Sequence, residues 1–124
     1  MILFDTSAVI ERLREGTVIE GYVLDLTYYE LANAMRTAVQ VKKYLQPEDA
    51  RTVLKAFEAQ PVQTIRAEIE DVGRIEELAE RLNITAHDAA YIYFAEKHGL
   101  ELVTADRRLE RAWKAEKDRR KRRA

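Results

Sequence analysis

Four carboxylates stand where they could act together as an acidic metal site: Asp5, Glu30, Asp88 and Asp106. Two of them directly follow short apolar runs, and the other two fall in the first turns of predicted helices. Two carboxylates about 4 Å apart repel each other by about 4 kcal/mol at an effective dielectric near 20. A hard divalent cation relieves this repulsion, and oxygen ligands without a His or Cys cluster favour Mg²⁺ or Mn²⁺ over Zn²⁺. The four residues therefore predict a magnesium or manganese site.

Each carboxylate also has a purely structural interpretation. Segments 27–30 and 85–88 both match the capping-box pattern, in which the acid reaches back to the backbone of the capping threonine. Asp5 and Asp106 can cap the helices that follow them. Asp88, however, lies on a nearly apolar helix, and burying an unpaired charge is costly. Capping explains the residues singly, whereas a shared metal explains them as a set.

The elements that must position these residues alternate along the chain. Apolar segments predict strands at 1–4, within 17–26, at 62–65 and at 100–104. Helical spacing predicts helices over 6–15, from Thr27 onward, from Pro47 to about 60, over 69–82, over 85–98 and from about 107 onward. Parallel strands need crossover connections, so the alternation predicts an α/β fold with helices on both faces of the sheet. Such sheets bind ligands outside the carboxyl ends of their strands.

Composition narrows the class of protein. The chain has 124 residues and no cysteine, which favours one domain and excludes a disulfide framework or a thiolate site. Apolar runs are too short for a membrane span, so we expect a cytoplasmic protein without a membrane partner. The net charge is −1, but residues 107–124 carry +7 and residues 1–106 carry −8. We predict a folded domain over 1–116 and a poorly ordered basic tail over 117–124.

Three interpretations of the basic tail are open. It can be a solvated tail, it can attract RNA phosphates, or it can dock against an acidic partner such as the 68–80 segment of another copy. The candidate RNA-binding residues are Arg119, Arg120, Lys121, Arg122 and Arg123.

Four segments resemble, in order and spacing, the motifs of PIN-domain ribonucleases, and the chain length resembles that of the small VapC-type toxins. The segments are Phe4-Asp5-Thr6-Ser7-Ala8, Tyr29-Glu30-Leu31-Ala32-Asn33-Ala34, Thr85-Ala86-His87-Asp88-Ala89-Ala90-Tyr91 and Thr104-Ala105-Asp106-Arg107-Arg108-Leu109. The resemblance covers residues 1 to 113. It implies a PIN-like three-layer α/β/α domain with a short, mainly parallel central sheet.

The resemblance also implies a function and a set of site residues. Asp5, Glu30, Asp88 and Asp106 would form the metal and catalytic site for Mg²⁺, with Mn²⁺ as an alternative. The supporting residues would be Thr6, Ser7, Asn33 and Thr104. The implied activity is endonucleolytic hydrolysis of RNA through metal-activated water, leaving 5′-phosphate and 3′-hydroxyl ends. A homodimer and a cognate VapB-like antitoxin that blocks the acidic crevice are implied as partners.

Two other functions are consistent with parts of the sequence. A non-catalytic nucleic-acid-binding or assembly module would use the acids only as helix caps. An aspartyl-phosphate enzyme would use Asp5 as nucleophile, but a second nearby Asp and a suitably placed lysine are missing.

Imidazole and aromatic chemistry are weaker candidates. His87 and His98 are eleven residues apart on one predicted helix, too far to act at one point. We interpret the tyrosines and the single tryptophan as core or interface residues, with three tyrosines near the crevice as candidates for RNA contact: Tyr28, Tyr29 and Tyr91.

Overall fold

The computed structural model describes residues 1–123, which form four strands, six α-helices and one π-helical turn. The strands are β1 (Ile2–Phe4), β2 (Gly21–Leu24), β3 (Val62–Ile65) and β4 (Glu101–Val103). The helices are α1 (Thr6–Glu15), α2 (Asp25–Arg36), α3 (Pro47–Glu58), α4 (Ile69–Leu82), α5 (Ala86–His98) and α6 (Arg107–Arg123), and the π-helical turn η1 (Thr37–Val41) continues α2.

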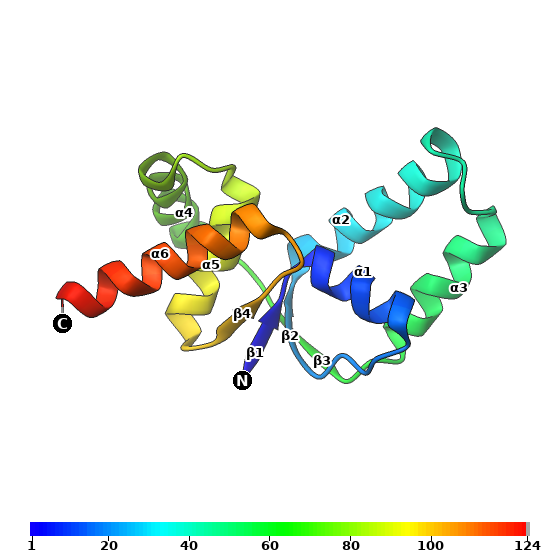
Figure 1. Cartoon of the computed structure of the whole chain (residues 1–124), viewed down its shortest axis with the longest axis horizontal. Coiled ribbons are helices and arrows are strands. Elements are labelled where there is room, and N and C mark those ends of the chain that lie inside the picture. Colours follow the sequence, from blue (N-terminus) through cyan, green and yellow to red (C-terminus); the bar gives the residue numbers. More distant parts are fainter. Residues whose placement is uncertain (124) are drawn as a thin grey trace.

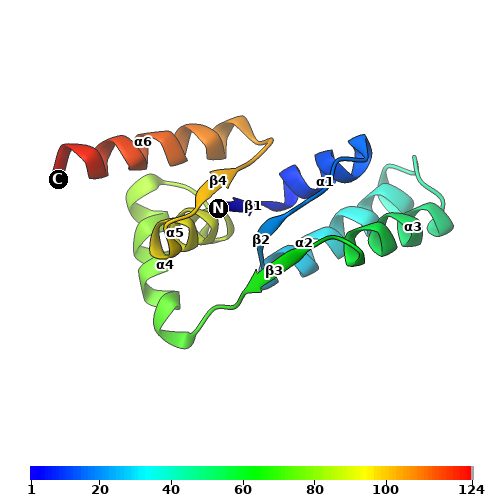
Figure 2. The same ribbon diagram turned by 90° about the horizontal axis from the view of Figure 1, so that it is seen from below.

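The strands form one sheet in the order β3-β2-β1-β4, and all three neighbouring pairs are parallel. Helices α1, α2 and α3 lie to one side of the strands, and α4, α5 and α6 lie to the other (Figure 1). The second view shows the same separation into two helical groups (Figure 2). The predicted three-layer α/β/α architecture with a short parallel sheet is confirmed.

Strand alternation creates two cores, because successive side chains of a strand point to opposite faces. In β1, Leu3 packs with the α4–α6 side and Phe4 with the α1–α3 side. In β2, Leu24 packs with the α4–α6 side and Val23 with the α1–α3 side. Trp113 is buried in the first of these cores, as its interpretation as a core residue predicted.

Helix α2 begins earlier than the sequence predicts. Its first residue is Asp25, so Thr27 lies inside the helix and does not cap it. The prediction of a capping box over residues 27–30 is wrong, because Thr27 is fully buried and its hydroxyl is hydrogen-bonded to that of Tyr91 on α5. A tertiary hydrogen bond thus uses the Thr27 hydroxyl, which the local sequence pattern predicted to cap the helix backbone.

Residues 117–123, expected as a poorly ordered tail, are helical in the structure and continue α6. Ion pairs anchor this part of the helix. Glu116 is buried and pairs with Arg81 on α4 at 2.8 Å and with Arg119 at 3.0 Å, while Arg120 pairs with Glu96 on α5 at 3.3 Å. The hydrogen bond from Arg81 is the main cause that lowers the pKa of Glu116 to about 2. The domain boundary at residue 116 stays a prediction, and Ala124 lies outside the described residues.

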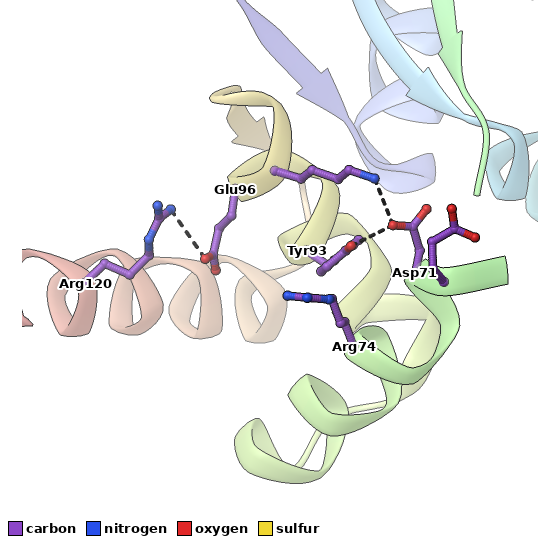
Figure 3. Close-up of a pocket in the computed structure, with 7 residues that line it drawn as sticks. Asp71, Arg74, Tyr93, Glu96 and Arg120 are labelled. Atoms are coloured by element: carbon purple, nitrogen blue, oxygen red, sulfur yellow. Dashed lines mark hydrogen bonds and ion pairs between the residues drawn. The ribbon is translucent and has the colours of Figure 1, made fainter. Parts of the chain in front are cut away.

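A second polar network joins α4 to α5. Asp71 is 1% exposed and accepts hydrogen bonds from the Tyr93 hydroxyl at 2.6 Å, the Lys97 Nζ at 2.8 Å and the Glu68 backbone N–H at 2.8 Å. Figure 3 shows Tyr93 directed at Asp71, and Glu96 joined to Arg120 on α6. The hydrogen bond from Lys97 is the main cause that holds the pKa of Asp71 well below its ordinary value. The network connects the helices that cover one face of the sheet.

We expect this network to make the fold acid-sensitive. A carboxylate whose pKa is depressed by folding stabilises the protein above its unfolded pKa, and that stability is lost as the pH falls through its folded pKa. Asp71 should therefore contribute stability that is lost progressively as the pH falls below about 4, the ordinary pKa of an aspartate. Urea unfolding of Asp71→Asn across this range should give a flatter pH dependence than the unmodified chain. Glu70→Gln, an exposed neighbour, is the control, and identical slopes for all three proteins would contradict the prediction.

Candidate acidic site

Asp5 is held at the carboxyl edge of the sheet by the ends of β1 and β4. These strands pair in register, and the Asp5 backbone N–H donates to the Val103 carbonyl at 3.2 Å. The Asp5 carboxylate accepts from the Thr104 hydroxyl at 2.7 Å, the Ser7 hydroxyl at 2.8 Å and the Ala8 backbone N–H at 2.9 Å. Asp5 therefore caps α1, as predicted, and two of the predicted supporting hydroxyls fix its orientation.

Glu30 projects from the second turn of α2 toward α1 and α5. Its Oε1 accepts from the Thr6 hydroxyl at 2.7 Å and from the Tyr91 hydroxyl at 2.6 Å. Because Tyr91 gives its only hydroxyl hydrogen to Glu30, the 2.8 Å contact between Tyr91 and Thr27 requires Thr27 to donate. Oε1 is thus occupied by two donors, and Oε2 lies 3.8 Å from the Nδ1 of His87.

Asp88 and Asp106 lie at the starts of α5 and α6. The Thr85 hydroxyl accepts from the Asp88 backbone N–H at 3.1 Å, so Thr85 caps α5 as predicted. Asp106 Oδ1 accepts from the Arg108 backbone N–H at 2.9 Å, and the Asp106 backbone N–H donates to the Thr104 hydroxyl at 3.0 Å. Capping thus accounts for one oxygen of Asp106.

The four carboxylates act on one another electrostatically. Burial is the main cause that raises the pKa of Asp5, and the negative charge of Asp106 raises it further. Burial also raises the pKa of Asp88 most, with further increases from Asp106 and then Glu30. Every one of the predicted acids is therefore within the electrostatic reach of another, and the structure brings together residues from four helix and strand ends. The positive charge of Arg108 offsets the effect of the neighbouring carboxylates on Asp88 only in part.

This donor set fits a hard divalent cation. The ligands available are carboxylate and hydroxyl oxygens, and the excess negative charge favours a cation. Within residues 1–123, no three Asp, Glu or His side chains approach closely enough to chelate one ion among themselves. Mg²⁺ keeps several waters and binds proteins through one or two carboxylates, so this spacing agrees with its chemistry.

Tyr91 and His87 differ from the expectations for them. Tyr91 is only 2% exposed, so the expectation that it could touch RNA is wrong: burial and the hydrogen bond to Glu30 hold its pKa far above the ordinary value. Its spacing of three from Asp88, which places both on one helical face, was the available signal. His87, set aside by the sequence argument, faces Glu30, and Asn33 lines the same cavity as Glu30. In the tail, two of the candidate RNA-binding residues are ion-paired to the fold: Arg119 and Arg120.

The three-layer α/β/α fold and the acidic residues at the carboxyl edge of its sheet are the two features that define the class of protein, and the comparisons with known proteins agree on that class. The model of the PIN domain family matches residues 2–114. The chain is 33% identical over 94 residues to "Ribonuclease VapC3" of Pyrobaculum aerophilum, which covers 73% of this chain and 69% of that protein. The crystal structure of PAE2754 from Pyrobaculum aerophilum superposes with a TM-score of 0.72 at 26% identity, covering 90% of this chain and 84% of the other.

The chain belongs to the PIN domain family. The family match spans β1 through about the first half of α6, so all four acidic residues fall inside it. Among residues 1–123, no helix has the length and hydropathy that spanning a bilayer requires.

Proposed function

We propose that the chain is a Mg²⁺- or Mn²⁺-dependent endoribonuclease and the toxin of a VapBC-type toxin-antitoxin pair. The observation that carries this proposal is a set of hydrogen bonds in a PIN-domain chain: the Thr104 hydroxyl contacts both Asp5 and Asp106, and the Thr6 and Tyr91 hydroxyls donate to Glu30. It supports a shared site that also includes Asp88. The 33% identity to a ribonuclease of the VapC group supports RNA as the substrate.

Asp5 and Asp88 would make the principal contacts to the metal, with Glu30 and Asp106 completing the site. A bound divalent cation lowers the pKa of water and neutralises charge that develops on a phosphate. The chain's own contribution is to hold the carboxylates in place before substrate arrives. Thr104 and Ser7 orient Asp5, and the hydroxyls of Thr6 and Tyr91 hold Oε1 of Glu30.

The test is cleavage of a labelled single-stranded RNA by the purified chain. We expect cleavage with Mg²⁺ or Mn²⁺, none with excess EDTA, and recovery when the metal is restored. The products should carry 5′-phosphate and 3′-hydroxyl ends. Absence of cleavage with both metals would reject the nuclease assignment.

A non-catalytic nucleic-acid-binding module is the second candidate, because Asp5 and Asp106 do cap helices. The same assay separates the two functions. RNA that is bound but never cut in the presence of either metal would favour the binding module.

The proposed partners follow from the same site. An Arg or Lys of a VapB-like antitoxin would neutralise the carboxylates that otherwise bind metal, and charge-assisted hydrogen bonds would make this inhibition strong. We further propose that the protein is a cytoplasmic homodimer. Co-expression with the short polypeptide of the neighbouring gene should give a complex that does not cleave RNA, and light scattering of the free toxin should give twice the chain mass.

Tyr91→Phe tests whether the buried hydroxyl network serves the site. The substitution removes one of two donors to Glu30 Oε1, and a hydrogen bond to a charged group contributes about 1.5–3 kcal/mol. We expect kcat to fall about 10-fold or more, with KM nearly unchanged, because the Tyr91 hydroxyl acts through Glu30 and does not touch RNA.

Tyr93→Phe is the matched control for Tyr91→Phe. Its hydroxyl also donates to a carboxylate from the same helix, but that carboxylate is Asp71, outside the acidic site. This variant should lose stability and keep its kcat. Equal kcat values for the two variants would show that Tyr91 has only a structural role.

A further inference from the structure

We propose that a cavity beside Glu30 binds one nucleobase of the RNA strand next to the phosphate being cleaved. The inference rests on the proposed ribonuclease function and adds a substrate subsite to it. The cavity has a volume of about 520 Å³ and is lined by Leu26, Tyr29, Glu30, Asn33 and His87. Four of its residues come from α2, and His87 comes from the first turn of α5.

The aromatic wall of this cavity is Tyr29. Its side chain is 77% exposed, although it directly precedes Glu30 in α2. Its neighbour Tyr28 behaves differently, because it contacts Phe57 edge-to-face and its hydroxyl bonds to that of Thr64. Single-stranded RNA is recognised by stacking of splayed bases on exposed aromatic rings. Tyr29 therefore offers a stacking surface immediately beside a carboxylate of the proposed metal site.

The polar wall of the cavity suits the edge of a base. Asn33 stands one helical turn after Tyr29 and carries both amide donors and a carbonyl acceptor. His87 is mostly exposed, and its imidazole adds one donor and one acceptor in the neutral form. Leu26 supplies an apolar surface at the same cavity. Stacking with mixed donors and acceptors is the combination by which proteins recognise unpaired bases.

The charges of the lining favour a base over a phosphate. Among the described residues, neither lysine nor arginine lines this cavity, and the Glu30 carboxylate forms part of its wall. A phosphate in the cavity would have only the cation of the proposed metal site to offset this carboxylate, whereas an uncharged base needs no such compensation. The arginines nearest in sequence to the acidic cluster, Arg107 and Arg108, follow Asp106 at the start of α6. The base is therefore assigned to the Glu30 side of the cluster.

The experiment compares Tyr29→Ala, Tyr29→Phe and Tyr44→Ala, all combined with Asp88→Asn to prevent cleavage. Tyr44 is 66% exposed and lies in the connection between η1 and α3, so it controls for loss of an exposed tyrosine. The probe is a fluorescent 12-nucleotide single-stranded RNA of random sequence, followed by anisotropy. We expect Tyr29→Ala to weaken binding about 5- to 100-fold. Tyr29→Phe should stay within about 2-fold because the ring face is retained.

The outcomes separate this inference from the proposed function. If the unmodified chain cleaves the RNA pool but Tyr29→Ala binds RNA as Tyr44→Ala does, the subsite is wrong and the nuclease assignment stands. If Tyr29→Ala weakens only an antitoxin complex and not RNA binding, the cavity serves the protein partner and the subsite is again wrong. A selective loss of RNA affinity in Tyr29→Ala, with cleavage by the unmodified chain, supports the subsite. In Asn33→Ala, sequencing the ends of cleaved RNA should show a changed base preference at one position beside the cut.

Discussion

Asp88→Asn should abolish metal-dependent RNA cleavage while leaving the fold intact. Burial raises the pKa of Asp88, and the charges of Asp106 and Glu30 raise it further. Removing this charge weakens binding of the cation while relieving repulsion among the other acids. We expect the rate of cleavage at saturating Mg²⁺ to fall by about 10³-fold or more. Thermal unfolding should occur at the same temperature as in the unmodified chain, or slightly higher.

The matched control is Asp118→Asn, which removes one exposed aspartate from α6 at a distance in sequence from the four acids. It should leave the cleavage rate within about 2-fold, as substitutions on exposed surfaces generally do. Asp5→Asn is a less direct test, because the Asp5 carboxylate also accepts hydrogen bonds from Thr104, Ser7 and the α1 backbone. Full activity of Asp88→Asn in Mg²⁺ would remove Asp88 from the site.

Gly21→Ala should destabilise the fold strongly, although the substitution adds only one methyl group. Gly21 opens β2 with a φ of 147°, a conformation that residues with a side chain rarely adopt. A Cβ there would lie 2.7 Å from the Ile2 carbonyl oxygen and 3.3 Å from a ring carbon of Phe4. The clash is with the backbone of β1, which cannot move without disturbing the strand that ends at Asp5. We expect a loss of about 3 kcal/mol or more, which lowers the melting temperature by roughly 10 °C.

Gly73→Ala is the opposite case and serves as the control. Gly73 lies within α4, and a Cβ there would meet nothing within 4 Å. Alanine is a better helix former than glycine, so this variant should be more stable by about 0.5–1 kcal/mol. Thermal melts of both variants decide the matter. If Gly21→Ala has the same melting temperature as the unmodified chain, β2 does not approach the Ile2 carbonyl of β1 this closely.

Local pattern was sufficient for most of the elements. The apolar runs located all four strands, and alternation with helical segments was enough to predict a parallel sheet covered on both faces. Pro47 begins α3, and Asn83 ends α4 in the left-handed conformation, as their residue types indicate. These features depend on neighbours within about one helical turn, so a single sequence contains the information. The order β3-β2-β1-β4 does not, because it depends on which apolar faces pack together.

Where the structure differs from the sequence-based expectation, contacts between residues far apart in the chain are the reason. Thr27 matches a cap by its spacing, yet it bonds to Tyr91, 64 residues further along the chain. The pattern of the basic end of the chain predicts a tail, yet it continues α6. There Arg120 pairs with Glu96 on α5, and Arg119 pairs with Glu116, which Arg81 on α4 also binds. Each case pairs a polar group with a partner that only packing brings within hydrogen-bond distance, and a buried group without such a partner would be costly.

The acidic residues themselves were readable from the sequence, because each stands at a strand end or helix start that a local pattern marks. The side chains that hold these carboxylates by hydrogen bonds could not be predicted from the sequence. Thr104 reaches Asp5 across 99 residues of chain, and Tyr91 reaches Glu30 across 61. The first pair meets because the sheet places the ends of β1 and β4 side by side. The second pair meets because folding brings α5 close to α2. The residue types determined the chemistry available to this protein, and the packing of α1, α2 and α5 decided which oxygens are held and which are left free.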